Sequence, residues 1–461
     1  MKMISVGIEE IRNRYFEKTK RSRELNVKAA NFLPGGDTRT SVFFEPYPPY
    51  MVRGKGCQIF DADGNQYLDY MNNYTTLIHG HDHPKIREAV VKQLEHGTIF
   101  GAPHLTQCEL AEVLCSRVPS IKKIRFCNSG TEGTMFAIRA AMAFTGRNKV
   151  IKIEGGYHGT HDIVEASVSP SLGEVGEIDS PKTVPNCLGI PTNVFDNVVI
   201  APFNDQERMR KVVQTHKNDL AAIIVEPILG VAGVIPANKD YLVFLRELTR
   251  ETGSLLIFDE IVSFRVAPGG AQEYYGVIPD LTVLGKIIGG GLPVGAFGGR
   301  EDVMELFSPQ KGRVPHAGTF NGHPLAMVAG LAAMQEMTTE VYAKINSLGD
   351  SLRRGITNVF HELDIKAKAG GVGSLIYLHY TLDEITNYRD SRRAREQVKM
   401  LPDLVNLCLL NHGIFIASRG QLALSTPMTD DDIRQTVQSF YDSFEELKPF
   451  MSQFLPNLIS G

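Results

Sequence analysis

Seven short runs of apolar residues between positions 124 and 299 constrain the fold of this chain more than any other feature. They are separated by segments with helical spacing, such as QERMRKVVQTHK and DYLVFLRELTRETG. Continuous Val, Ile, Leu and Phe runs are typical of strands that are covered on both faces. The pattern therefore predicts an α/β fold with a doubly wound, mostly parallel, seven-stranded sheet. The runs occupy residues 124–127, 149–154, 197–203, 221–227, 254–260, 281–285 and 294–299.

The N-terminal part of the chain has a different pattern. Residues 1–32 have the spacing of an amphipathic helix that ends before the turn Leu33-Pro34-Gly35-Gly36. Residues 45–50 are too rich in proline for a helix and are expected to form an extended arm. Residues 50–71 alternate between apolar and polar and break at Asp63-Gly64, which predicts a small antiparallel hairpin.

The C-terminal part begins with a long helical stretch over residues 326–363 and ends with a helix that starts at Asp430-Asp431-Asp432. Negative charge is favourable at such a helix start. Together the two chain ends are expected to build a small α+β domain beside the large one. The expected divisions are an N-terminal helix, arm and hairpin, a large α/β domain, and a C-terminal small domain, over residues 1–70, 71–330 and 331–461.

Composition limits the classes of partner. The chain has 461 residues, 43% of them hydrophobic, and 48 Lys and Arg against 52 Asp and Glu give a net charge of -4. This balance argues against nucleic acid and anionic membrane surfaces as partners. Six scattered cysteines without a CxxC motif favour free thiols, and no apolar run approaches the ~20 residues that span a bilayer. We expect a cytoplasmic protein.

Charged residues follow three of the apolar runs, at the point where each strand should end. Glu226 follows AAIIV, Asp259 ends SLLIFD and Lys286 follows LTVLG. In an open parallel sheet, ligands bind beyond the carboxyl ends of the strands. Asp259 and Lys286 can meet there if their strands are neighbours, although a single charge leaving a strand is also an ordinary structural feature.

The segment Cys127-Asn128-Ser129-Gly130-Thr131-Glu132 lies between a strand and the helical sequence TMFAIRAAMAFTG. Two hydroxyls, a glycine and the N–H groups of a helix start are suited to a phosphate. Ser and Thr at such positions are also common as plain helix caps. The segment is no Walker A loop, because no lysine follows its last glycine.

A third strand end carries Gly155-Gly156-Tyr157-His158-Gly159. Glycines allow the backbone to approach a ligand closely, and the aromatic ring between them can lie flat on a planar ligand. A lysine, a carboxylate, a phosphate cradle and a stacking aromatic together fit one cofactor, pyridoxal 5'-phosphate (PLP), whose aldehyde condenses with a lysine amine.

Several long motifs in this chain resemble class III, fold-type I aminotransferases over roughly residues 30–440. In chain order they are NSGTEGTMFAIRAA, EGGYHGTHD, VEP, LIFDEIVSFR, VLGKIIGGGLPVGAFGG and HAGTFNGHPLA. The resemblance implies that Lys286 is the Schiff-base lysine and that Asp259 pairs with the pyridine nitrogen. It implies a homodimer with shared active sites, in which Thr319 reaches the phosphate of the neighbouring subunit. The other implied cofactor contacts are Ser129, Gly130, Thr131, Tyr157 and Glu226.

Two terminal segments, GGDTRTSVFFEPYPPY and ASRGQLALSTPMTDDDI, are most similar to the β-amino acid (β-phenylalanine) aminotransferases. By that resemblance Arg39 receives the carboxylate of a β-amino acid donor, and Arg419 receives the α-carboxylate of an oxo acid such as 2-oxoglutarate or pyruvate. A guanidinium can bind a carboxylate through two hydrogen bonds. Tyr74 is expected to line the side-chain pocket. The alternative for either arginine is a solvated surface charge.

Other interpretations remain open or are excluded. The alternative activities are a glutamate-1-semialdehyde 2,1-aminomutase, which is an isomerase, and a D-phenylglycine-type aminotransferase. A binding protein without a cofactor is a third class. His79, His81 and His83 lack a second group of ligands, so we expect no metal site. The glycine-rich segment GGGLPVGAFGG lacks the GxGxxG pattern and acidic partner of a dinucleotide site.

Overall fold

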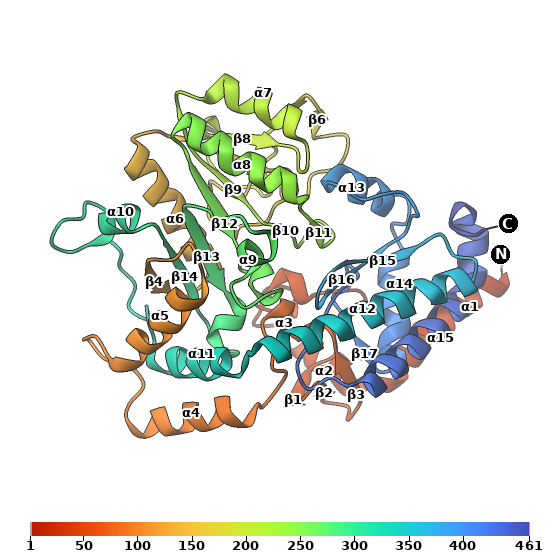
Figure 1. Ribbon diagram of the computed structural model, residues 1–461. Helices are drawn as coiled ribbons and strands as arrows, with labels where there is room; N and C mark the ends of the chain where they lie inside the picture. The colour runs from red at the N-terminus through yellow and green to blue at the C-terminus, as the bar shows by residue number, and fades with distance from the viewer. Residues whose placement is uncertain (1, 461) are drawn as a thin grey trace. The chain divides into compact units, whose positions relative to one another are not determined.

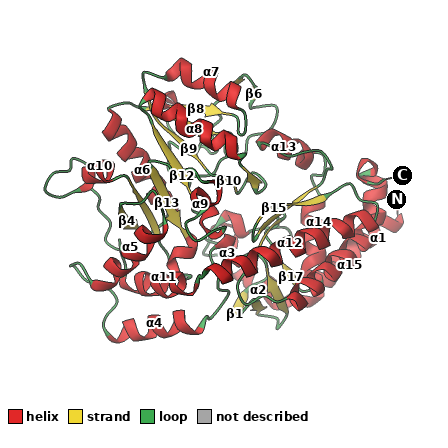
Figure 2. Cartoon of the chain, viewed as in Figure 1, coloured by secondary structure: helices red, strands yellow, loops and turns green. Residues whose placement is uncertain are grey.

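The computed structural model describes residues 2–460, and the side chains of residues 7–460 (Figures 1 and 2). The chain divides into two compact units. One unit consists of Met1–His83, Lys344–Asp383 and Ala394–Gly461, and the other of Pro84–Ala343 and Glu384–Arg393. We call them the terminal unit and the sheet unit.

The sheet unit contains a seven-stranded sheet with the order β4-β14-β13-β12-β9-β5-β8. Each of the seven predicted runs forms one strand, which confirms this part of the sequence analysis. Six strands run in the same direction, whereas β14 is antiparallel to both of its neighbours, β13 and β4. The strands are β4 (Lys123–Cys127), β5 (Lys149–Ile153), β8 (Val198–Ala201), β9 (Leu220–Val225), β12 (Leu255–Asp259), β13 (Leu281–Gly285) and β14 (Gly295–Gly299).

Helices cover the central strands on both faces, because every residue of β9, β12 and β13 is buried. Helix α6 (Gly130–Thr145) packs against β9, β12, β13 and β14, and it ends at Gly146 in the left-handed conformation. Helix α8 (Lys239–Thr252) packs against β9 and β12. Figure 2 shows the strands surrounded by these helices.

The sheet unit has further helices and short strands. The helices are α4 (Pro84–Glu95), α5 (Leu105–Arg117), α7 (Gln206–His216), α9 (Ala271–Tyr275), α10 (Glu301–Met304), α11 (Pro324–Glu336) and α13 (Tyr388–Glu396), which extends past the unit boundary. The two-residue strands are β6 (Gly176–Glu177), β7 (Ser180–Pro181), β10 (Ile228–Leu229) and β11 (Ile235–Pro236).

The terminal unit is an α+β structure made from both ends of the chain, as predicted. Its four-stranded sheet has the order β1-β2-β3-β17, and β17 from the C-terminal part runs parallel to β3. A three-stranded sheet has the order β15-β16-β18. The strands are β1 (Met51–Lys55), β2 (Gln58–Asp61), β3 (Gln66–Asp69), β15 (Lys368–Val372), β16 (Leu375–His379), β17 (Ile414–Phe415) and β18 (Gln421–Ala423).

Helices from both chain ends share the hydrophobic core of the terminal unit, where Tyr15, Phe360 and Phe444 are buried together. The expected helix over residues 1–32 is interrupted at Thr19, whose Oγ1 donates to the carbonyl of Tyr15 at 2.6 Å. The predicted stretch over 326–363 is likewise two helices, α11 and α12. The helices are α1 (Lys2–Lys18), α2 (Lys20–Ala29), α3 (Asn72–Thr75), α12 (Thr339–Glu362), α14 (Leu401–Asn411) and α15 (Asp430–Phe454).

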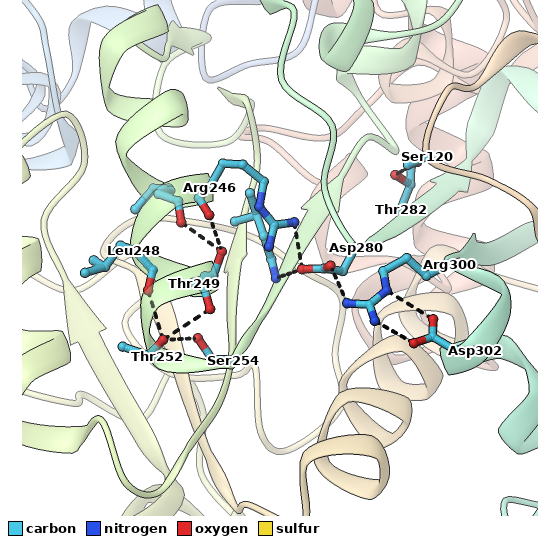
Figure 3. Close-up of polar contacts among 12 residues, drawn as sticks. Ser120, Arg246, Leu248, Thr249, Thr252, Ser254, Asp280, Thr282, Arg300 and Asp302 are labelled. Carbon is cyan, nitrogen blue, oxygen red and sulfur yellow. Dashed lines mark hydrogen bonds and ion pairs between the residues drawn. The ribbon is translucent and has the colours of Figure 1, made fainter.

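A buried carboxylate organises the amino ends of β12 and β13 (Figure 3). Oδ2 of Asp280 accepts a hydrogen bond from the backbone N–H of Leu256 at 2.8 Å and lies 2.8 Å from Nη1 of Arg246. Oδ1 of Asp280 accepts from Nη1 of Arg300 at 2.9 Å. Arg300 is also paired with Asp302 on its exposed side. This network lies at the amino ends of β12 and β13. Asp259 and Lys286 lie at the opposite, carboxyl ends of the same strands.

The six cysteines are free thiols. Among residues 2–460, no helix has both the length and the apolar character needed to cross a membrane.

Candidate active site

Asp259 and Lys286 lie at the carboxyl ends of two neighbouring parallel strands. Asp259 is the last residue of β12 and pairs in register with Val283 of β13, and Lys286 follows directly after β13. Burial raises the pKa of Asp259 to about 7, and the charge of Lys286 acts in the opposite direction. Lys286 has a φ of +50°, a conformation that costs energy for a residue with a Cβ. The fold therefore holds this lysine in a strained position beside a buried carboxyl group.

His158, to which the sequence analysis assigned no role, contacts Asp259. Its Nδ1 lies 2.8 Å from Oδ2 of Asp259, and its backbone carbonyl accepts a hydrogen bond from Oγ1 of Thr134 at 2.6 Å. Its Nε2 is buried without a hydrogen-bond partner among the described residues. The sequence placed His158 beside Tyr157, but only the order of the strands brings it to Asp259.

The first turn of α6 carries Ser129, Gly130 and Thr131. Ser129 caps helix α6, which was the alternative to a phosphate contact in the sequence analysis. Its Oγ accepts from the N–H of Glu132 at 3.2 Å. Oγ1 of Thr131 accepts from the N–H of Thr160 at 3.3 Å. A Cβ on Gly130 would lie 2.4 Å from the side chain of Ile261. The segment combines the N–H groups of a helix start, two hydroxyls and a glycine in a close-packed place, which suits a phosphate.

Glu226 supports the loop that carries Tyr157. Its two carboxylate oxygens accept from the N–H groups of Tyr157 at 2.8 Å and Gly230 at 3.0 Å. Burial raises the pKa of Glu226 to about 6. Tyr157 itself is 39% exposed, so part of its ring is open to a ligand.

Lys152 is a fully buried lysine at the same loop, and the sequence analysis did not single it out. Its Nζ donates to the carbonyl of Gly156 at 2.5 Å. Burial lowers the pKa of Lys152 to about 7, against the opposing charges of Glu226 and Glu165. It thus fixes the backbone directly before Tyr157.

Thr319 is exposed on a loop of the sheet unit. The loop is tied to the start of α6, because Oδ1 of Asn321 accepts from Nδ2 of Asn128 at 2.9 Å. The structure therefore places Thr319 at the surface.

Arg39, Tyr74 and Arg419 come together in the terminal unit. Nη1 of Arg39 donates to Oδ1 of Asn73 at 2.8 Å, and the guanidinium of Arg419 lies over the Tyr74 ring, 5.0 Å from its centroid. A cavity of about 540 Å³ in this unit is lined by Arg39 and Tyr74. Its apolar wall consists of Val42, Phe44, Met71, Phe415 and Ile416, among others. The candidate site residues thus form two groups, one in each unit.

The residues of the sheet unit fit PLP. Asp259 is a buried carboxyl group whose ionised form needs a cationic partner, Tyr157 offers a ring face, and the start of α6 offers phosphate donors. The glycine cradle is also close-fitting: a Cβ on Gly159 would lie 2.4 Å from Oγ1 of Thr131. Lys286 supplies the amine that reacts with an aldehyde.

Fold and site together define a fold-type I, PLP-dependent transferase. The family model for class-III aminotransferases matches residues 44–443, so the chain belongs to the class-III aminotransferase family. It is a PLP-dependent aminotransferase, since PLP is the cofactor of this family.

Three similar proteins differ in the reactions that their names describe. A glutamate-1-semialdehyde 2,1-aminomutase of Methanothermobacter thermautotrophicus is 43% identical over 81% of this chain and 87% of the relative. An omega-transaminase of Sphaerobacter thermophilus is 43% identical, with a TM-score of 0.88, covering 92% of this chain and 97% of that one. A β-phenylalanine aminotransferase of Variovorax paradoxus is 33% identical, with a TM-score of 0.88, covering 97% of this chain and 98% of that one.

Proposed function

We propose that this enzyme transfers the amino group of a β-amino acid with an aromatic or aliphatic side chain to an oxo acid such as 2-oxoglutarate or pyruvate. One observation carries the proposal: Arg39 and Arg419 both contact the turn at Asn73 and Tyr74, and Arg39 lines a cavity that has an apolar wall. A transaminase binds two different carboxylates in turn, and a guanidinium is the side chain best suited to hold a carboxylate.

The donor of this proposal is a β-phenylalanine-like molecule. Arg39 binds its carboxylate, while Val42, Phe44 and Tyr74 of the cavity contact its side chain. Burying an aromatic ring against such a wall is favourable, at about 25 cal/mol for each Å² of apolar surface. The cavity of about 540 Å³ has room for a ring of this size.

The acceptor carboxylate belongs to Arg419 in this proposal. The guanidinium is held by the Tyr74 ring and by Oε1 of Gln421, which accepts from Nε at 3.1 Å. An incoming carboxylate is a stronger acceptor than the neutral amide of Gln421 and can take over its hydrogen bonds.

The residues of the sheet unit carry the chemical step. PLP supplies an electron sink for the bond that breaks at the amine-bearing carbon. Nζ of Lys286 accepts the proton from that carbon and later returns it, as general base and then acid. Asp259, oriented by His158, holds a cationic ring nitrogen through its carboxylate. Ser129, Gly130 and Thr131 would bind the phosphate and Tyr157 would cover the ring. Glu226 fixes the Tyr157 loop and would serve the ring hydroxyl.

The enzyme works as a homodimer in the cytoplasm in this proposal. Thr319 lies exposed on its loop, where it is available to a phosphate bound by the neighbouring subunit. Free thiols at all six cysteines suit a reducing compartment.

A second candidate is the glutamate-1-semialdehyde 2,1-aminomutase, favoured by the 43% identity to the archaeal relative. A mutase moves the amino group within one molecule and needs no acceptor, so a second carboxylate-binding arginine and a cavity with an apolar wall have no purpose in it. A D-phenylglycine-type aminotransferase would use the same cavity, and it differs from the first proposal in the position of the amine.

A donor panel tests these proposals. Holoenzyme is incubated with β-phenylalanine, aliphatic β-amino acids, D-phenylglycine or glutamate 1-semialdehyde, each with and without 2-oxoglutarate or pyruvate. Turnover of a β-amino acid only when an oxo acid is present supports the proposal. Conversion of the semialdehyde without acceptor supports the mutase and overturns it.

The assigned lysine is tested separately by borohydride treatment of the holoenzyme. The cofactor should become covalently attached to the peptide that contains Lys286, and Lys286→Ala should remove both the label and turnover. Lys152→Met is the control, because it removes a different lysine of the sheet unit, one that is buried, and should leave the label in place. A label on any other peptide would contradict the assignment.

A further inference from the structure

Four consecutive residues of the terminal unit, Asn72 to Thr75, have left-handed backbone angles. Their φ values are 47°, 47°, 56° and 72°. A single asparagine adopts this conformation at moderate cost, but a run that includes tyrosine and β-branched threonine is rare. Such strain persists only where the surroundings hold the backbone in place, and it concentrates at functional sites.

The surroundings of this turn do hold it in place. Oδ1 of Asp69 accepts from the N–H groups of Met71 at 3.0 Å and Asn72 at 2.8 Å. Nδ2 of Asn72 donates to the carbonyl of Ala423 at 2.7 Å. Both Asp69 and Asn72 are buried, so the left-handed turn is a firmly anchored part of the structure.

The two middle residues of the turn contact both arginines. The amide of Asn73 accepts from the guanidinium of Arg39, and the phenol of Tyr74 donates to the carbonyl of Ser41, two residues after Arg39. The ring of Tyr74 lies under the guanidinium of Arg419. One side chain, Tyr74, therefore supports the Arg39 segment with its hydroxyl and Arg419 with its ring face.

We propose that Tyr74 is a specificity-determining residue that positions both carboxylate-binding arginines from one rigid turn. This inference rests on the proposed function, in which Arg39 serves the donor and Arg419 the acceptor. The hydroxyl and the ring of Tyr74 act on different arginines, so the two contributions can be removed one at a time. Tyr74→Phe removes only the hydroxyl, whereas Tyr74→Met removes the aromatic ring as well. Asn73→Ala removes the amide partner of Arg39.

Ligand binding to the holoenzyme tests the inference without turnover. The dissociation constants of 3-phenylpropanoate, a donor analogue without an amine, and glutarate, an acceptor analogue, are measured by calorimetry. Tyr74→Phe and Asn73→Ala should weaken the binding of 3-phenylpropanoate roughly three- to tenfold, as expected for the loss of one hydrogen bond. The binding of glutarate should stay unchanged. Tyr74→Met should weaken the binding of both ligands, and that of glutarate by roughly two- to fivefold because a cation–π contact is lost. Equal weakening of both ligands by Tyr74→Phe, or no weakening by Tyr74→Met, would overturn the inference.

A second measurement uses no substrate analogue and separates this inference from the proposed function. Phenylglyoxal modification of each arginine is followed by peptide mass spectrometry in the same variants. Asn73→Ala should raise the rate at Arg39 alone, and Tyr74→Met should raise the rates at Arg39 and Arg419. Arg23, which lies over the Phe16 ring at 5.6 Å in the same unit and does not line the cavity, is the control and should not change. If the wild type fails to bind 3-phenylpropanoate, the donor assignment is wrong, but these rates still decide the role of Tyr74. Unchanged rates at Arg39 and Arg419 in every variant would refute that role.

Discussion

Nδ1 of His158 lies 2.8 Å from Oδ2 of Asp259, and both side chains are buried. His158 follows β5 and Asp259 ends β12, with β9 between the two strands. Burial lowers the pKa of His158 to about 3, so the imidazole is neutral at neutral pH. When Asp259 is ionised it can only accept, so the proton of the imidazole lies on Nδ1. His158 thus orients the carboxylate without adding a positive charge that would compete with the pyridine ring.

Replacement of His158 should therefore weaken cofactor binding. In His158→Phe, Asp259 loses a donor, which makes its ionised form less favourable. The loss of a hydrogen bond to a charged group corresponds to roughly 10- to 100-fold in PLP affinity. Titration of the cofactor-free enzyme with PLP, followed by visible absorbance, measures this change. His158→Asn is the matched control, since its amide donor occupies a position close to Nδ1; equal losses in both variants would argue against an orienting role.

The raised pKa of Asp259 makes the stability of the cofactor-free enzyme depend on pH. In the folded state the carboxyl group of Asp259 keeps its proton up to about pH 7, whereas the ordinary pKa of an Asp carboxyl group is 3.8. The stability that this proton contributes is present below the ordinary pKa and is lost as pH rises through about 7. The difference in unfolding free energy between wild type and Asp259→Asn should fall over this window by at most about 1.4 kcal/mol for each pH unit. Urea unfolding at pH 5, 6, 7 and 8 measures it, and a difference that grows with pH would contradict the prediction.

Gly159 is predicted to be essential for the shape of the phosphate cradle. It has a φ of +96°, and an added Cβ would lie 2.6 Å from Cα of Thr131. Gly159→Ala must therefore move the first turn of α6, and PLP affinity should fall by roughly tenfold or more, as for the loss of a charge-assisted hydrogen bond. Gly146→Ala is the control, because no atom lies within 4 Å of its added Cβ. It should lower stability by about 1 kcal/mol and leave PLP affinity unchanged.

The Asp280 network should affect stability and not catalysis. Asp280→Asn leaves the largely buried guanidinium of Arg246 without its charge partner, which should cost about 3 kcal/mol of unfolding free energy. Arg300→Met should cost about 1 kcal/mol or less, because the Arg300 side chain is 43% exposed. Denaturant unfolding and kcat are measured for both variants. A large fall in kcat at unchanged stability would show that the network acts on the site.

The strands of the sheet unit were predictable because each apolar run is short and continuous, and the central strands β9, β12 and β13 are buried at every residue. The reversal of β14 was not predicted, although its connection to β13, residues 286–294, is too short for the crossover that a parallel strand requires. The break at Thr19 was not predicted; Thr19 contacts the hydroxyl of Tyr47, 28 residues further along the chain, and no local pattern indicates that contact.

The candidate site was predictable where a residue follows a buried strand, as Glu226, Asp259 and Lys286 do. His158 was missed because its partner lies 101 residues away and is reached only through the strand order. The left-handed turn at Tyr74 was also not predictable, since nothing in the letters NNYT outweighs the steric preference against four such residues in succession.

The two arginines and Lys286 lie in different compact units, and this has a consequence for how such enzymes diversify. Substitutions around Arg39, Tyr74 and Arg419 alter one hydrophobic core, while the packing that supports Lys286 and Asp259 belongs to another. Substrate preference can then change under selection while the packing around Lys286 and Asp259 stays the same. A laboratory library restricted to segments 37–44 and 415–421 should yield many active members with altered donor range.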